Sequence, residues 1–141
     1  MTVKKDKPVL ISIVELGGYP DFTKLYQSLG FKVFILESMR KAIKFIKKNE
    51  VEVIVAEFNF QSDFRDRTSQ VETLMASLAQ KPHVEVIIFY DKEQGHQFTR
   101  VSNRFDFLAA LTYPVNEIDI EKVLASAWTK SLATNYFPFK H

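Results

Sequence analysis

Cysteine is absent from this chain of 141 residues, and glycine and proline are scarce, at four and five. The lack of cysteine excludes a disulfide framework, a thiolate nucleophile and a cysteine-ligated zinc site. The chain also lacks the glycine-rich phosphate-loop patterns and the G-x-S-x-G pattern of a serine nucleophile. Its three histidines, His83, His96 and His141, have no carboxylate at ligand spacing. We therefore expect no bound metal, no cofactor and no enzymatic activity.

Long apolar runs are missing as well. The run from Val9 to Val14 is too short for a signal-peptide core and is followed by Glu15. No run approaches the roughly 18 apolar residues that span a bilayer. The net charge is only +2, from 19 basic and 17 acidic residues, which gives no reason to expect nucleic-acid binding. We expect a soluble, cytoplasmic protein that does not contact membranes.

What the chain does contain is a regular alternation of apolar strand-length runs with amphipathic helical segments. The runs show little polar alternation, which is typical of strands buried on both faces of a parallel sheet. Strands are predicted at residues 9–14, 32–36, 51–56, 84–90 and 107–111. Asp21 and Ser38 are predicted to cap the first two helices, and Gly30 lies where a helix C-cap belongs.

Right-handed crossovers between such strands place helices on both sides of the sheet. The pattern predicts an α/β fold of the doubly wound (βα)5 class, a three-layer sandwich. Five such units in a chain of this length resemble the flavodoxin-like group, which implies the strand order 2-1-3-4-5. We expect a single domain over residues 1–141. Residues 1–7 are predicted to be a flexible basic N-terminus, and residues 134–141 an aromatic C-terminal extension that packs on the domain or on a dimer mate.

Two segments give the chain a resemblance to a known family. The segment Leu111-Thr-Tyr-Pro-Val115, with an acidic stretch after it, resembles the end of the fifth strand in CheY-like response-regulator receiver domains. The segment Val53-Ile-Val-Ala-Glu-Phe-Asn59 resembles the receiver strand that ends in the phosphoacceptor aspartate. The resemblance implies two-component signal transduction as the biological context.

At its functional positions the chain departs from that family. Glu57 stands at the acceptor position with Asn59 after it, and Glu15 is the one acid where receivers have a pair for Mg²⁺. Phe89 stands where receivers carry the Thr or Ser that contacts phosphate, and it cannot donate a hydrogen bond. Tyr113 replaces the receiver lysine, before Pro114. We therefore interpret the chain as a degenerate pseudo-receiver.

Four further expectations concern this site, and the first of them is implied by the resemblance. Tyr113-Pro114 is expected to be a cis peptide bond, and the first helix is expected to be about one turn short. Glu57 either mimics a phosphorylated aspartate or is only a polar residue at a strand end. Tyr113 is expected to approach Glu57 or Glu15 and to fill the former site with a hydrogen bond.

Receivers commonly signal through the face formed by the fourth helix, fifth strand and fifth helix, so we expect a partner-binding face there. Its predicted residues are Phe98, Val101, Arg104, Ala110 and Trp128. The expected partner is another signalling protein or a second copy of the chain, which would form a homodimer. We interpret the chain as a stand-alone, phosphorylation-independent interaction module.

Two alternatives remain open from the sequence. One is an atypical phosphorylatable regulator, with Glu57, Asp63 or Asp66 as the acceptor. The other is a flavodoxin-like small-ligand binder that uses the cleft of Glu15, Glu57 and Tyr113, because such folds place ligands at the carboxyl end of the sheet.

Overall fold

Five parallel strands form the central sheet. The computed structural model describes residues 7–59 and 70–134, with side chains as far as Ala127. The strands run in the order β2-β1-β3-β4-β5, which confirms the predicted topology. Their bounds are β1 (Val9–Ile13), β2 (Lys32–Leu36), β3 (Val53–Glu57), β4 (Glu85–Tyr90) and β5 (Ala109–Thr112).

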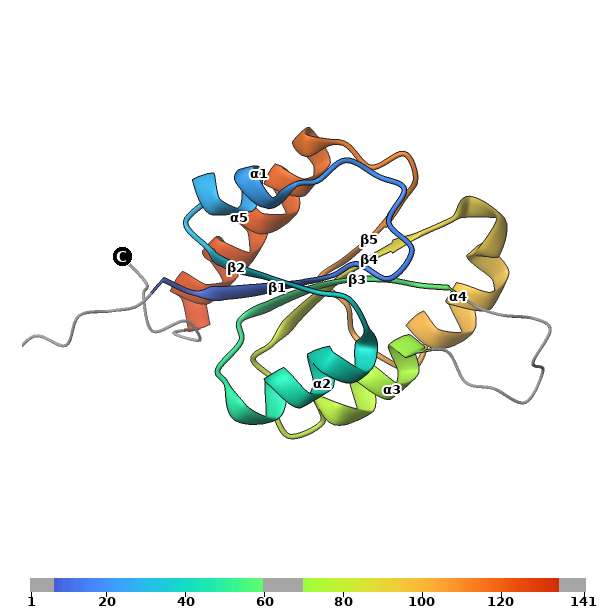
Figure 1. Cartoon of the computed structure of the whole chain (residues 1–141), viewed down its shortest axis with the longest axis horizontal. Helices are drawn as coiled ribbons and strands as arrows, with labels where there is room; N and C mark the ends of the chain where they lie inside the picture. Colours follow the sequence, from blue (N-terminus) through green and yellow to red (C-terminus); the bar gives the residue numbers. More distant parts are fainter. Residues whose placement is uncertain (1–6, 60–69, 135–141) are drawn as a thin grey trace, which may run out of the picture.

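Helices cover both faces of the sheet (Figure 1). On one face lie α1 (Thr23–Ser28) and α5 (Glu117–Thr134). On the other lie α2 (Met39–Lys48), α3 (Gln70–Ser77) and α4 (Gly95–Ser102), with a short 3₁₀ turn, η1 (Lys92–Gln94), ahead of α4. All the residues of β3 are buried, because this central strand has helices above and below it. The three-layer architecture predicted from the apolar runs is therefore confirmed.

The two layers of side chains form two separate cores. Alternate residues of each strand point to opposite faces, so Leu10 and Val53 pack with α1 and α5, whereas Ile11 and Ile54 pack with α2, α3 and α4. Glu57 shares its face with Val53 and Val55, which directs its side chain toward the α1–α5 layer. Because of this alternation, the carboxylate of Glu57 is accessible to loops on the α1–α5 side of the sheet.

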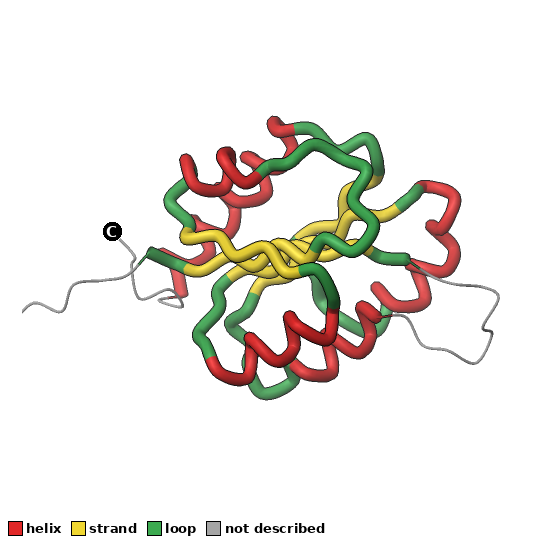
Figure 2. The backbone as a smooth tube through the Cα atoms, in the orientation of Figure 1, coloured by secondary structure: helices red, strands yellow, loops and turns green. Residues whose placement is uncertain are grey.

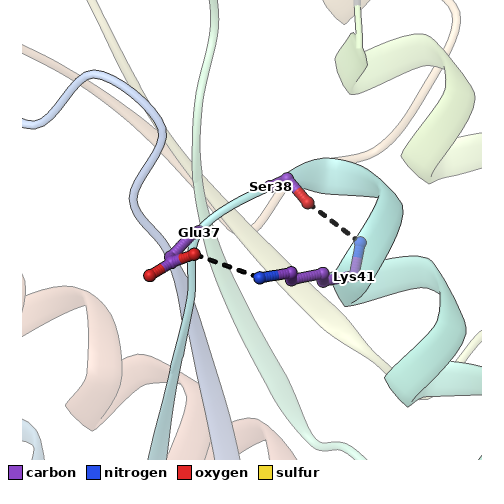
Figure 3. A network of polar contacts seen from close by, with 3 residues as sticks. All are labelled: Glu37, Ser38 and Lys41. Carbon is purple, nitrogen blue, oxygen red and sulfur yellow. Dashed lines mark hydrogen bonds and ion pairs between the residues drawn. The ribbon is translucent and has the colours of Figure 1, made fainter.

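The start of α2 shows how local sequence sets a helix boundary. Ser38 has extended backbone, and its side chain accepts a hydrogen bond from the backbone N–H of Lys41 at 3.1 Å. Lys41 also forms an ion pair with Glu37 at 3.1 Å (Figure 3). The cap satisfies one of the N–H groups that a first helical turn leaves without an intrahelical partner. Ser38 is the predicted cap, and the prediction is confirmed.

Several predicted boundaries need correction. The fifth strand begins at Ala109, not at residue 107, and the third begins at Val53. After β4 the chain forms η1 and then α4, which ends at Ser102, so Phe105 lies beyond the helix. The N-cap of α1 is Phe22, while Asp21 accepts hydrogen bonds from the backbone and hydroxyl of Thr23.

The first helix is short, with six residues, as expected. Gly30 follows its C-cap in the left-handed region, with φ of 101°, as a glycine in this position should. Figure 2 shows the long connection from β1 to α1, which leaves the sheet at its carboxyl end and returns over the α1–α5 face. Across the parts of the chain that the structure describes, no helix is both long and apolar enough to cross a membrane.

Candidate functional site

Glu57 is the centre of the candidate site. It is the last residue of β3, lies beside Phe89 of β4 in the sheet, and is only 3% exposed. Its Oε1 accepts a hydrogen bond from the backbone N–H of Leu16 at 3.0 Å. Its Oε2 accepts one from the backbone N–H of Gly17 at 3.1 Å and one from the hydroxyl of Tyr19 at 2.7 Å. Both carboxylate oxygens are therefore engaged by one loop.

That loop can wrap around the carboxylate because of its two glycines. Gly17 and Gly18 have φ of 70° and 83°, which non-glycine residues rarely adopt. The turn directs two successive backbone N–H groups inward, an arrangement that forms a small anion-binding concavity. The side chain of Leu16 points the other way and is 71% exposed. The sequence pattern gives no sign of this contact between the turn and Glu57.

An aromatic cluster packs around the ring of Tyr19. The ring of Tyr19 meets Phe89 edge-on, with centroids 5.2 Å apart, and stacks on Tyr113 at 5.8 Å. Phe22 adds a further edge contact to Phe89 at 6.3 Å. Both geometries are favourable for aromatic pairs. Phe89, Tyr113 and Phe22 are thus in one aromatic cluster with the ring of Tyr19.

The surroundings also keep the tyrosines protonated. Burial raises the pKa of Tyr19, and the hydrogen bond to Glu57 and the charge of Glu57 raise it further. Burial, with the charges of Glu57 and Asp91, raises the pKa of Tyr113 to about 12. A protonated Tyr19 can donate to Glu57 over the whole physiological pH range.

Glu15 turns toward a different partner. Its Oε2 accepts a hydrogen bond from the backbone N–H of Met39, at 3.2 Å, in the first turn of α2. Burial raises the pKa of Glu15, the bond to Met39 opposes that rise, and the charge of Glu57 adds to it. The two acids thus lie close enough to interact electrostatically, but their carboxylates accept hydrogen bonds from different groups.

This arrangement does not fit the Mg²⁺ site that the receiver resemblance implies. Mg²⁺ requires carboxylate oxygens with free lone pairs in near-octahedral geometry. Here N–H and O–H donors point at the oxygens of Glu57, and the position of a second acid next to Glu15 is occupied by Leu16. Among the described residues, no group of three His, Cys, Asp or Glu side chains could hold a metal ion.

The prediction that Tyr113 donates a hydrogen bond to Glu57 or Glu15 is wrong, because a different tyrosine is the donor. Tyr113 lies in the site, as predicted, but Tyr19 donates to Glu57 while Tyr113 stacks on the Tyr19 ring. Sequence reasoning had not assigned Tyr19 a role. The available signal was a tyrosine just after the Gly17-Gly18 turn, in a loop that must pass the carboxyl ends of the strands.

The remaining residues of the predicted pocket are also placed. The Tyr113-Pro114 peptide bond is cis, which confirms the expectation, and Pro114 is exposed. Phe89 is 1% exposed, and its carbonyl accepts a hydrogen bond from the backbone N–H of Phe58 at 2.9 Å. Asn59 is half-buried directly after Phe58. The alternative acceptors Asp63 and Asp66 lie outside the described residues, as does the C-terminal tail.

The predicted partner face is only partly at the surface. Phe98 and Val101 are 5% and 3% exposed and pack in the core beneath α4, so the expectation that they meet a partner is corrected. Arg104 is exposed and forms an ion pair with Glu72 at 2.7 Å, and Ala110 is exposed on β5. The side chain of Trp128 is not among those that the structure describes.

No family model and no curated protein matches this sequence. Solved structures do match the fold over most of its length. A receiver domain protein from Clostridium thermocellum is 15% identical, with a TM-score of 0.67, over 89% of this chain and 96% of the other. A CheY-like receiver domain protein from Methanospirillum hungatei JF-1 is 17% identical, with a TM-score of 0.60, over 90% and 98%.

A third neighbour carries a different name. The structure described as adenylate cyclase from Rhodopirellula baltica is 17% identical, with a TM-score of 0.65, over 93% of this chain and 94% of the other. Identities this low speak for the fold and leave the activity open, since one fold supports many functions. The strand order, the crossovers and these likenesses agree, and the chain has the fold of CheY-like response-regulator receiver domains.

Proposed function

We propose that this chain is a pseudo-receiver, a signalling module that acts through protein contacts without being phosphorylated and without catalysing a reaction. One observation carries the proposal: the carboxylate at the acceptor position is 3% exposed and accepts three hydrogen bonds from its own β1–α1 loop. A phosphoryl donor would have to displace Tyr19 and the loop amides before it could reach an oxygen of Glu57.

The neighbouring residues support the same conclusion. Phosphoryl transfer relies on positioned cations and hydrogen-bond donors that neutralise the charge of the transferred group. Phe89 and Tyr113, at the positions where receivers place a hydroxyl and a lysine, supply aromatic rings packed on Tyr19 instead. In this arrangement Glu57 is a structural anchor for the β1–α1 loop rather than a nucleophile.

The test is incubation with acetyl phosphate and Mg²⁺, followed by intact-mass measurement alongside an active receiver domain as the positive control. We expect no adduct of about 80 Da, the mass of an added phosphoryl group. An adduct on the unaltered protein would show that the chain is a phosphorylatable receiver and that the proposal is wrong. Loss of that adduct in Glu57→Ala but not in Glu37→Ala would identify Glu57 as the acceptor.

We place the protein contact at the surface between α4 and β5. A hollow of about 360 Å³ lies there, with Phe105, Asp106, Phe107 and Ala110 among its lining residues. Arg104 and Ala110 are exposed beside it. The partner is another signalling protein or a second copy of this chain.

Sedimentation at increasing concentration tests the second copy. If copies associate here, Ala110→Arg should abolish the association, because a long charged side chain would enter the interface. Ala79→Arg, at an exposed alanine just after α3, is the matched control and should leave it intact. A monomer at every concentration would exclude the homodimer and leave a different protein as the partner.

A further inference from the structure

A second feature, a pocket, shares Tyr19 with the Glu57 site. It is a pocket of about 260 Å³ between the edge of the sheet and α1. Its lining includes Ser12, Val14, Tyr19, Phe22, Tyr26 and Ile35. Ser12 and Ile35 are paired neighbours in β1 and β2, so they form adjacent parts of the pocket floor.

The short first helix explains why this space is open. The chain leaves β1 after Ile13 and does not become helical until Thr23, and α1 then ends at Ser28. β2 is an edge strand and depends on α1 for cover on this face. With only six residues, α1 leaves the carboxyl end of β2 uncovered, and Ile35 is 50% exposed although it is a large apolar residue in a strand.

Two polar groups in this pocket have no partner within the described protein. Ser12 is 7% exposed and Tyr26 is 2% exposed, yet neither side-chain hydroxyl makes a hydrogen bond to a described residue. Buried hydroxyls are normally hydrogen-bonded, because leaving one unpaired costs free energy. Both hydroxyl oxygens keep some solvent-accessible surface. For Ser12, the accessible space is this pocket. A bound molecule could supply the missing partner.

The other groups around the pocket restrict what that molecule can be. The walls are mainly aromatic and aliphatic, and aromatic side chains favour stacked or edge-on contacts with another ring. Asp21 lies at the rim, but its Oδ1 already accepts hydrogen bonds from the backbone N–H and hydroxyl of Thr23, at 2.9 and 2.6 Å. No cation is among the lining residues, so a buried charge would find no counterpart.

We propose that this pocket binds a compact, uncharged aromatic molecule of the phenol class, whose polar group pairs with the hydroxyl of Ser12. The volume suits one ring with a small substituent, since a cavity of about 150 Å³ already holds a benzene molecule. Burial raises the pKa of Tyr26, so its hydroxyl stays protonated and can donate to the same molecule.

The pocket is connected to the Glu57 site through one residue. Tyr19 lines the pocket and also donates its hydroxyl to Glu57 at 2.7 Å. A ligand that packs on the Tyr19 ring would hold the loop in the conformation that covers Glu57. The ligand site would thereby set the stability of the β1–α1 loop. It does not depend on whether Glu57 accepts a phosphoryl group, so the two proposals fail separately.

The test uses phenol and toluene as probes, followed by amide chemical shifts in NMR. We expect saturable phenol binding with a Kd on the order of 1 mM, as suits a molecule with few contact atoms. Ser12→Ala should weaken phenol binding about three- to tenfold, the usual effect of one hydrogen bond, and leave toluene binding unchanged within about twofold.

A pair of matched variants locates the site. Ile35→Trp should block the pocket and abolish the shifts, whereas Ile118→Trp, at an exposed isoleucine in α5 that does not line the pocket, should preserve them. The proposal is overturned if phenol produces no saturable shifts up to about ten times the expected Kd. It is also overturned if Ser12→Ala weakens both probes equally, or if Ile35→Trp binds phenol as the unaltered protein does.

Discussion

Glu57 and Ser12 are two buried polar side chains on the same face of the sheet, in adjacent strands, and the β1–α1 loop treats them differently. The loop closes over Glu57 with two backbone N–H groups and the hydroxyl of Tyr19. It passes Ser12 without contributing a hydrogen bond, and the short α1 leaves space above it. Burying a carboxylate without partners costs more free energy than burying a neutral hydroxyl without one, so the hydrogen bonds of this loop contribute most at Glu57.

The largest expected effect comes from Glu57→Ala. The change removes three hydrogen bonds to a charged group and leaves the donors of Leu16, Gly17 and Tyr19 without their acceptor. We expect the free energy of unfolding, measured by urea denaturation, to fall by about 2–4 kcal/mol. Glu37→Ala, at an exposed residue, should change it by less than about 0.5 kcal/mol. A loss below about 1 kcal/mol for Glu57→Ala would show that the loop does not depend on this carboxylate.

The next effect compares two tyrosine hydroxyls. Tyr19→Phe keeps the ring contacts but removes the donor to Glu57, so unfolding should become easier by about 1–2 kcal/mol. Tyr26→Phe removes a hydroxyl that has no partner among the described residues, and it should be close to neutral. Thermal and urea unfolding of both variants measure the two changes in the free energy of unfolding. Equal losses of stability in the two variants would show that the hydrogen bond from Tyr19 to Glu57 contributes no more than the unpaired hydroxyl of Tyr26.

Ser12→Ala should have a smaller effect still. Because the Ser12 hydroxyl makes no hydrogen bond to a described residue, its removal leaves no donor or acceptor behind. We expect a change in the free energy of unfolding of less than about 0.5 kcal/mol, and a gain in stability is consistent with the structure. A loss above about 1 kcal/mol would mean that the hydroxyl has a partner within the protein.

The sequence predicts the fold and the identity of the central residues, but not their contacts. Apolar runs such as residues 9–14 specify buried parallel strands, and their alternation with helices specifies a doubly wound sheet. The strand order was expected from the resemblance to the flavodoxin-like group. Whether Tyr19 or Tyr113 reaches Glu57 depends on the path of the β1–α1 loop, which tertiary packing determines. The burial of Phe98 and Val101 was misjudged for a related reason: an i, i+3 apolar pair marks the core-facing stripe of any amphipathic helix as well as a partner surface.

The smallest expected effect is a change in the titration of Glu15, and it tests whether the charge of Glu57 acts on Glu15. Burial is the main reason that the pKa of Glu15 is above its ordinary value of 4.5, and the charge of Glu57 adds to the rise. Glu57→Gln removes that charge, so the pKa of Glu15 should fall, as followed by NMR of its side-chain carboxyl. Glu37→Gln is the control and should leave the pKa of Glu15 where it is.

The sign of the accompanying pH dependence follows from linkage. A carboxyl whose pKa is raised by folding binds its proton more tightly in the folded state, so its contribution to stability is fully present below pH 4.5 and is lost as the pH rises through the folded pKa. Glu57→Gln should make this loss smaller and shift it to lower pH. If the pKa of Glu15 does not move, the charge of Glu57 does not act on Glu15, and the electrostatic coupling between the two acids is absent.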